Sequence, residues 1–128
     1  LKTELKQRVD LRDLTTITIK ASETDSADDA ITLEYTESGH WRLGIHIADV
    51  AHYVEAGSPL DREAQKRGTS VYLGELVIPM LPEQITDELC SLQPGKDRLA
   101  ISVLITLDDN GQVVEFEIQP SVIQVDYK

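Results

Sequence analysis

The chain has 128 residues, of which 41% are hydrophobic, so it is long enough to form the core of one domain or of part of one. Its formal net charge of −11 argues against a broad basic surface for nucleic acid, because nonspecific affinity comes from Lys and Arg that neutralise phosphates. A single cysteine excludes an internal disulfide, and no apolar run approaches the roughly 20 residues needed to span a bilayer.

The beginning of the sequence lacks the basic and then apolar build of a secretory signal. We therefore expect a cytoplasmic protein that has no membrane partner. If the whole protein binds nucleic acid, the basic surface for it must come largely from segments outside this acidic sequence.

The first predicted strand covers residues 15–20, where apolar and polar residues alternate as they do in a half-buried strand. An acidic segment follows, and the alternation resumes at residues 30–35. After a predicted turn at 37–40, residues 41–48 form the second strand of the same hairpin. This pairing predicts that the acidic segment lies beside the strand carrying His46, which we interpret as a hydrogen-bonded structural residue.

The clearest helix signal covers residues 59–67. Ser58 precedes it as an N-cap, Pro59 occupies the first helical position, and Gly68 is a plausible end point. Beyond it, short extended pieces are predicted at residues 69–73 and 75–78, and one or two helical turns at 82–89.

Two further strands are predicted at residues 99–107 and 112–118. The residues between them contain Asn110-Gly111, a strong hairpin signal. The fold class is therefore α+β, with a mostly antiparallel β-sheet and a few short helices. Cys90 lies in an apolar context, where a buried thiol is usually inert.

The acidic segment contains three aspartates within five residues: Asp25, Asp28 and Asp29. A magnesium ion prefers oxygen ligands and typically uses one or two carboxylates together with substrate phosphates, so the segment is compatible with phosphodiester chemistry. Taken alone, such a segment is more often a solvated turn in which aspartates cap backbone amides. Its surroundings decide between these two interpretations.

Several sequence blocks, in their order and at their separations, closely resemble the catalytic domain of the ribonuclease II and ribonuclease R family, the RNB domain. The blocks are residues 10–14 (DLRDL), 24–30 (TDSADDA), 43–50 (LGIHIADV), 67–73 (RGTSVYL), 78–82 (IPMLP), 89–92 (LCSL) and 97–99 (DRL). The resemblance covers nearly all of the chain. Because the family's domain is considerably longer, it implies that residues 1–128 are the N-terminal portion of a single RNB-type catalytic domain.

The resemblance implies a 3′-to-5′ exoribonuclease that hydrolyses single-stranded RNA to nucleoside 5′-monophosphates, with Mg²⁺ or Mn²⁺ polarising the scissile phosphate and activating water. It matches Asp28 to a carboxylate critical for cleavage and Asp29 to a metal ligand. It also places Tyr72 where the family has a tyrosine that contacts RNA near its 3′ end, although a tyrosine in an alternating strand could simply fill the core. Single-stranded RNA is thus the expected partner, and DNA is not expected.

The resemblance also implies four aspartates in the metal-binding set, and the sequence departs from it at two of them. Lys20 and Ser26 stand at the first two positions, so the set carries a formal charge of −1 where four aspartates would carry −4. Asp25 could recover one unit of charge by moving one position along the loop. Lys20 could occupy part of a cation's place and attract an RNA phosphate, or it could extend outward and leave a weak single-metal site.

Two functional classes remain open. The first is a metal-dependent exoribonuclease of the RNB family. The second is a catalytically impaired RNB-type protein that binds RNA or a protein partner, with its metal site weakened or lost through Lys20 and Ser26. Fold alone does not choose between them, because function depends on the site.

Overall fold

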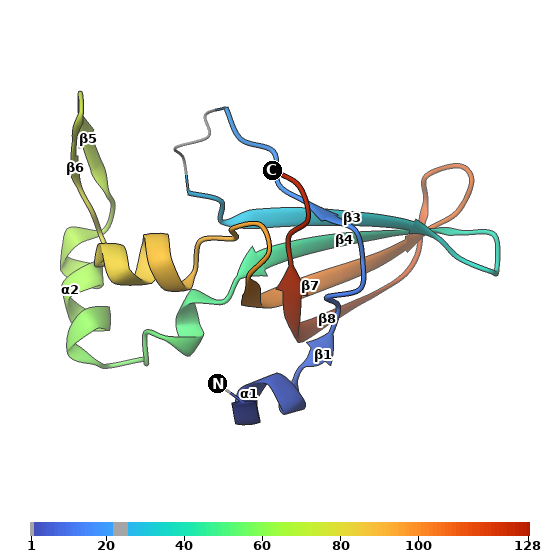
Figure 1. Ribbon diagram of the computed structural model, residues 1–128, viewed down its shortest axis with the longest axis horizontal. Coiled ribbons are helices and arrows are strands. Elements are labelled where there is room, and N and C mark those ends of the chain that lie inside the picture. Colours follow the sequence, from blue (N-terminus) through green and yellow to red (C-terminus); the bar gives the residue numbers. More distant parts are fainter. Residues whose placement is uncertain (1, 22–25) are drawn as a thin grey trace. The chain divides into compact units, whose positions relative to one another are not determined.

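A six-stranded sheet is the main element of the chain in a computed structural model that describes residues 2–21 and 26–128 (Figure 1). The strand order is β1-β8-β7-β4-β3-β2, and every neighbouring pair is antiparallel except β1 with β8. The strands are β1 (Val9–Asp10), β2 (Thr16–Ile17), β3 (Asp29–Tyr35), β4 (Trp41–Ala48), β7 (Asp97–Leu107) and β8 (Val113–Gln124), and helix α1 (Lys2–Gln7) precedes them. The α+β, mostly antiparallel class predicted from the sequence is confirmed.

The chain divides into two units. One contains the sheet and α1, and the other runs from Asp49 to Ser91. The second unit is built from a 3₁₀ turn η1 (Val50–His52), helix α2 (Pro59–Arg67), the hairpin β5 (Val71–Leu73) and β6 (Leu76–Ile78), and a short π-helical segment η2 (Gln84–Leu89). Within the described ranges, no helix is long and apolar enough to cross a membrane.

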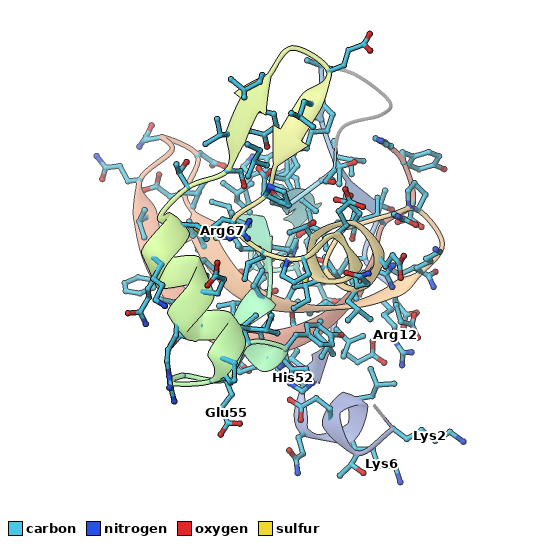
Figure 2. The ribbon with its side chains drawn as sticks, turned by 90° about the vertical axis from the view of Figure 1, so that its left-hand side faces the viewer. Lys2, Lys6, Arg12, His52, Glu55 and Arg67 are labelled. Carbon is cyan, nitrogen blue, oxygen red and sulfur yellow. The ribbon has the colours of Figure 1, made fainter. Side chains whose placement is uncertain are left out.

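Helix α2 has the boundaries and caps that its sequence predicts. Ser58 Oγ accepts a hydrogen bond from the Asp61 N–H at 3.2 Å, and Gly68 closes the helix at a φ of 70°, a left-handed conformation that suits glycine. Arg67 lies at the end of the helix (Figure 2). Its Nη1 donates to the Pro79 carbonyl at 2.8 Å. This bond ties α2 to the segment that follows β6.

One face of the sheet, which we call the apolar face, carries large hydrophobic side chains from β3, β4, β7 and β8. Most of them are half-buried or exposed, whereas Leu99 and Val122 at one end of the face are buried. The cross-strand register places Leu33, Leu43, Ile105 and Phe116 in a single row, of which Phe116 is 66% exposed. The half-buried and exposed residues of this face are Ile31, Leu33, Tyr35, Trp41, Leu43, Ile45, Ile47, Ile101, Val103, Ile105, Leu107, Val113, Phe116, Ile118 and Pro120. A contiguous exposed apolar surface of this kind is typical of an interaction surface.

The opposite face, which we call the buried face, is lined by small and polar residues together with the buried Leu104 and Ile123. His46 is fully buried there, with Nε2 3.0 Å from Thr32 Oγ1 and Nδ1 2.7 Å from Ser102 Oγ. Ser102 Oγ is in turn 2.6 Å from Ser121 Oγ, so one hydrogen-bonded chain crosses four strands. Gly44 leaves room for this chain, since a Cβ there would collide with Thr32 Oγ1 and lie 2.7 Å from His46 Nε2.

The residues after β8 return to pair with the short edge strand β2. Tyr127 bridges Ile17, and its carbonyl accepts the Thr18 N–H at 2.9 Å. Asp126 Oδ2 accepts the Thr16 N–H at 2.8 Å. These bonds satisfy backbone groups that an open sheet edge would leave unpaired.

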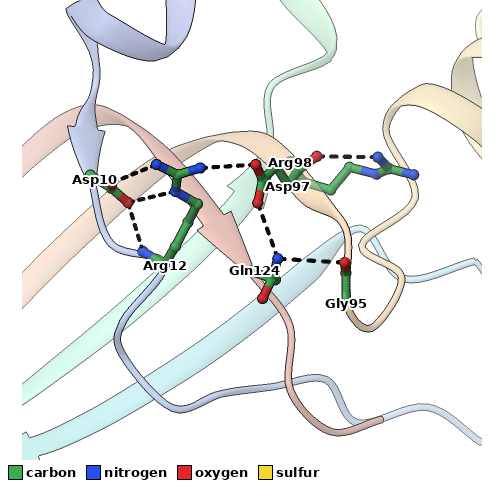
Figure 3. Close-up of polar contacts among 6 residues, drawn as sticks. All are labelled: Asp10, Arg12, Gly95, Asp97, Arg98 and Gln124. Carbon is green, nitrogen blue, oxygen red and sulfur yellow. Dashed lines mark hydrogen bonds and ion pairs between the residues drawn. The ribbon is translucent and has the colours of Figure 1, made fainter.

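A polar cluster fastens β1 to the beginning of β7 (Figure 3). The Arg12 guanidinium donates to Asp10 at 2.7 and 2.9 Å and to Asp97 at 2.9 Å. Gln124 Nε2 donates to the other oxygen of Asp97 at 3.1 Å. Arg12, which lies in the DLRDL block at residues 10–14, therefore has a structural role that the family resemblance does not assign.

Three features differ from the sequence predictions. The first strand ends at Ile17 rather than Lys20, since its ladder with β3 stops at the pair of Ile17 with Ile31. Strand β8 continues past residue 118 to Gln124, and Pro120 is tolerated in it since pairing with β1 begins only at Ser121. Neither α1 nor β1 was predicted, because both are too short to show a periodic pattern.

Candidate functional site

The acidic residues predicted to carry chemistry lie at the start of β3. The Asp28 carbonyl accepts the Ala48 N–H at 2.9 Å, so the ladder with β4 extends one residue before the strand begins. On the other side, the carbonyl of buried Ala27 accepts the Leu92 N–H at 2.9 Å. The backbone that carries Asp28 and Asp29 is therefore held from both sides, and both aspartates are exposed.

The two aspartates belong to opposite faces of the sheet. Asp29 pairs with Ile47 in a row of the apolar face, whereas Asp28 is level with Ala48 and Ala100 in a row of the buried face. Successive side chains of an extended strand point to opposite sides. The two carboxylates therefore diverge, and each needs further ligands to hold a cation.

Lys20 comes from the neighbouring segment after β2. The register of β2 against β3 pairs Thr16 with Thr32 and Ile17 with Ile31, and Lys20 lies three residues beyond the end of this pairing. Lys20 is half-buried. Within the described ranges, no side-chain hydrogen bond or ion pair involves Lys20, Asp28 or Asp29.

The remaining predicted positions of the loop are Ser26 and Asp25. Ser26 is half-buried. Asp25, predicted as a displaced metal ligand, lies outside the described residues. Its prediction is neither supported nor contradicted by the fold.

The family resemblance implies divalent metal, and the chemistry of these donors does not fit a two-cation centre. Such a centre needs dense negative charge around two ions about 4 Å apart. The described positions offer two diverging carboxylates, one hydroxyl and one ammonium, and no group of three His, Cys, Asp or Glu side chains gathers anywhere within residues 2–21 and 26–128. Any metal would need oxygen ligands from elsewhere in the whole protein.

Tyr72 is 73% exposed in β5, paired with Val77 of β6. The alternative in which Tyr72 fills a core is therefore wrong. Both strands of this hairpin are apolar and exposed throughout, a feature that the sequence pattern of alternation did not indicate. The hairpin is an accessible aromatic and aliphatic surface within the second unit.

His46 and Cys90 are confirmed as structural residues. Burial lowers the pKa of His46 to about 4, so its imidazole is neutral near pH 7, and its two nitrogens are occupied by Thr32 and Ser102. His46 is fully buried. The Cys90 side chain is 4% exposed, which keeps the thiol from acting as an accessible nucleophile.

A groove of about 500 Å³ lies at the end of the sheet opposite to the start of β3. It is lined by residues of the β3–β4 and β7–β8 hairpins, including His40, Arg42 and Phe116. Figure 1 shows both hairpin turns at this end, away from the start of β3 where Asp28 lies. Arg42 is held in the groove by Glu117 at 2.7 Å, so its charge is neutralised there. The groove is not part of the acidic site.

Comparison with known proteins extends the resemblance beyond short blocks. The model of the RNB domain matches residues 8–128. Ribonuclease R of Thermotoga maritima is 51% identical over 123 residues, which are 96% of this chain and 17% of that protein. Ribonuclease R of Escherichia coli is 46% identical over 116 residues, 91% of this chain and 14% of that protein. The chain thus spans less than a fifth of the length of these relatives.

Solved structures give the same result for the fold. Mycoplasma genitalium RNase R in complex with ribose methylated single-stranded RNA matches with a TM-score of 0.87 and 37% identity, over 94% of this chain and 19% of that one. Yeast Ssd1, a pseudonuclease, matches with a TM-score of 0.89 and 28% identity, over all of this chain and 16% of that one. With 121 of its residues covered by the domain model and its fold shared with these structures, the chain belongs to the RNB family.

Proposed function

We propose that the whole protein acts on the 3′ end of single-stranded RNA as a 3′-to-5′ exoribonuclease. The observation that carries the proposal is the exposed Asp28 at the start of β3, on a backbone fixed by Ala48 and Leu92 and within a segment that matches the RNB domain. The similarity to ribonuclease R over nearly the whole chain supports this activity, as does the likeness to an RNase R that binds single-stranded RNA.

In this proposal Asp28 takes part in cleavage and Asp29 contributes a metal ligand. A divalent Mg²⁺ or Mn²⁺ ion would supply Lewis acidity at the scissile phosphate, and the rest of its ligands would come from outside the described residues. Tyr72 contacts RNA. Its exposed ring suits stacking on a base, which tolerates any sequence because every base has a π face.

A second candidate is favoured by one specific observation, the mismatch between the donor set and metal. Lys20 and Ser26 bring one positive and one neutral side chain to positions that the resemblance gives to aspartate. The likeness to a pseudonuclease supports the same alternative. The protein would then bind RNA, or a protein partner, without hydrolysing RNA.

A time course of the whole protein on 5′-labelled single-stranded RNA, with Mg²⁺ or Mn²⁺, separates the two candidates. The parent is compared with Asp28→Asn, with the Lys20→Asp, Ser26→Asp double variant, and with Asp109→Asn. Asp109 is a matched control because it is an exposed aspartate in the turn of the β7–β8 hairpin.

Stepwise shortening by the parent and by Asp109→Asn, abolished in Asp28→Asn, is the result expected of the exoribonuclease. Shortening only by the double variant would overturn that proposal and support the non-hydrolytic candidate. Shortening that persists in Asp28→Asn at the parent's rate would remove Asp28 from the reaction.

A further inference from the structure

Strand β8 has an unpaired outer edge over residues 113–120. On its inner side the strand pairs with β7, whereas on its outer side β1 pairs only with Ser121 and Val122. Within residues 2–21 and 26–128, no strand besides β1 and β7 pairs with β8. An open edge of this kind presents backbone N–H and C=O groups to which a further strand can be added.

The backbone direction along this edge follows from one hydrogen bond. The Val122 carbonyl accepts the Leu11 N–H at 2.9 Å, so the backbone groups of Val122 are directed outward. The direction alternates from one residue to the next where the register with β7 is regular. Phe116, Ile118 and Pro120 therefore direct their backbone groups outward as well, and Pro120 has no N–H to leave unpaired. The N–H groups of Phe116 and Ile118 are available to an added strand.

The side chains of this edge differ between the two sides of the sheet. Phe116 and Ile118 belong to the apolar face and are 66% and 60% exposed. Glu115 and Glu117 are on the opposite side, where they line the groove of about 500 Å³ together with Arg42. A strand that pairs with this edge therefore meets acidic and apolar side chains in alternation.

The acidic side of the edge carries more negative charge than its one arginine neutralises. Arg42 Nη2 lies 2.7 Å from Glu117 Oε1, and Arg42 Nη1 lies 4.0 Å from Glu34 Oε1. Glu115 has no hydrogen bond or ion pair within the part of the chain that the structure describes. These three carboxylates and one guanidinium leave a formal charge of −2. A basic side chain opposite Glu115 would be attracted to it.

The same charges make a second copy of this chain a poor occupant of the edge. Antiparallel pairing of two β8 edges about Glu117 would set this residue opposite its own counterpart. Pairing about Phe116 would set Glu115 opposite Glu117. Like charges directly opposite each other destabilise a strand pair, and the carboxylates would also repel the phosphates of RNA.

We propose that the outer edge of β8, at residues 113–120, binds an extended segment of a partner protein in which basic and apolar residues alternate. The segment adds a strand to the sheet, and its backbone pairs with Phe116 and Ile118. Its basic side chains lie opposite Glu115 and Glu117, and its apolar side chains extend the apolar face. The inference concerns a protein partner and does not depend on RNA hydrolysis.

The test measures binding of the whole protein to a fluorescein-labelled peptide of about seven residues that alternates lysine with valine, which is long enough to span this edge. Fluorescence anisotropy gives the affinity. In one control peptide glutamate replaces each lysine. In a second control peptide the lysines remain and every backbone nitrogen is methylated, which removes the donors that strand pairing needs.

Two variants of the protein change the edge, and each has a matched control. Glu115→Lys reverses the unpaired charge, and Glu55→Lys makes the same change of charge at an exposed glutamate of the other unit. Ile118→Pro removes an outward N–H without removing a bond to β7, and Ile118→Val keeps that N–H. Circular dichroism and thermal melting establish that each variant is folded.

The parent is expected to bind the lysine peptide about tenfold or more tightly than either control peptide. Glu115→Lys and Ile118→Pro should each weaken this binding about fivefold or more, while Glu55→Lys and Ile118→Val stay within about twofold of the parent. Hydrogen–deuterium exchange over residues 113–120 should be fast in the free protein and slower with the lysine peptide bound.

Equal affinity for the lysine peptide and its methylated form would show attraction by charge alone and would overturn strand addition. Equal affinity for the glutamate peptide would overturn the charge preference. Absence of binding, with slow exchange over residues 113–120 in the free protein, would show that the protein's own residues cover the edge. Absence of binding with fast exchange would show that the edge takes no strand of this kind, and each of these results leaves the proposed RNA hydrolysis untouched.

Discussion

His46 Nδ1 lies 2.7 Å from Ser102 Oγ, at a contact between β4 and β7 where both residues are fully buried. A neutral imidazole offers one donor and one acceptor, which matches its two hydroxyl partners. A protonated imidazole would present two donors and place a charge in the interior. The protonation state of His46 is therefore coupled to folding.

The first prediction concerns pH. The folded pKa of His46, about 4, lies below the ordinary value of 6.5, so the unfolded chain binds the proton more readily between these values. The contribution of His46 to the free energy of unfolding is fully present above pH 6.5. It is lost as the pH falls toward 4, by about 3 kcal/mol. In denaturant unfolding at pH values from 7 down to 4, the free energy of unfolding should fall less for His46→Gln than for the parent. The exposed His52→Gln serves as control, and equal slopes in all three proteins would contradict the prediction.

The second prediction concerns Gly44, which packs against the same hydrogen-bonded chain. Gly44→Ala should lower the free energy of unfolding by about 1–3 kcal/mol, because the new methyl group overlaps Thr32 Oγ1 and crowds His46. In the Gly44→Ala, Thr32→Ala double variant the obstructing oxygen is absent, so part of the loss caused by the methyl group should be regained. A double-mutant cycle by chemical denaturation measures the coupling. Additive losses would show that the steric argument is wrong.

The third prediction uses two threonines of the same segment. Thr18 Oγ1 is buried and has no hydrogen-bond partner among the described residues, whereas Thr16 Oγ1 donates to the Leu14 carbonyl at 2.9 Å. Thr18→Val should therefore raise the free energy of unfolding by about 1 kcal/mol, and Thr16→Val should lower it by a similar amount. Opposite signs are the expected result in urea titrations. A loss in both variants would mean that the Thr18 hydroxyl is satisfied in solution.

The fourth prediction concerns the exposed cluster of Arg12. Hydrogen bonds from the Arg12 side chain, and then from its backbone N–H, lower the pKa of Asp10 from 3.8 to about 2. Stability from Asp10 is thus present above pH 3.8 and is lost as pH falls toward 2. Carboxyl NMR titration of Arg12→Gln should show the Asp10 pKa rising toward 3.8. Arg62→Gln, which removes an arginine that does not contact Asp10, should leave it near 2.

The fifth prediction concerns the apolar face. Residues 1–128 expressed alone should self-associate and bind a hydrophobic dye, because seven large hydrophobic side chains of one sheet face are exposed and their neighbours on that face are only half-buried. Leu33→Lys with Phe116→Lys should reduce both effects, while Gln112→Lys in the exposed hairpin turn should not. Analytical ultracentrifugation and dye fluorescence give the two readouts. A monomer that binds no dye would show that the face is shielded.

Much of the fold follows from local sequence signals. The caps Ser58 and Gly68 fixed the limits of α2, and strict alternation located β4 to the residue. The alternation could not reveal which side of the sheet is buried, since the buried face is the one with small and polar side chains. That assignment depends on contacts between distant strands, as in the pairing of His46 with Ser102.

The candidate site was predictable in position but not in geometry. The spacing of the aspartates located the acidic segment, and its place beside β4 is confirmed by the Asp28 to Ala48 bond. The divergence of Asp28 and Asp29 follows from the register with β4. Two adjacent aspartates in the sequence do not show to which face of the sheet each side chain points.

The buried hydrogen-bonded chain of Thr32, His46, Ser102 and Ser121 helps to fix the register of the sheet. Strands β4 and β7 present Leu, Ile and Val on the apolar face, and such side chains could slide past one another with little change in packing. A slip of two residues between β4 and β7 would leave His46 on the same face but set it opposite Ala100 or Leu104, and its bond to Ser102 would be lost. The polar interior thus selects one alignment among several of similar hydrophobicity, and with it the level at which Asp28 meets β4.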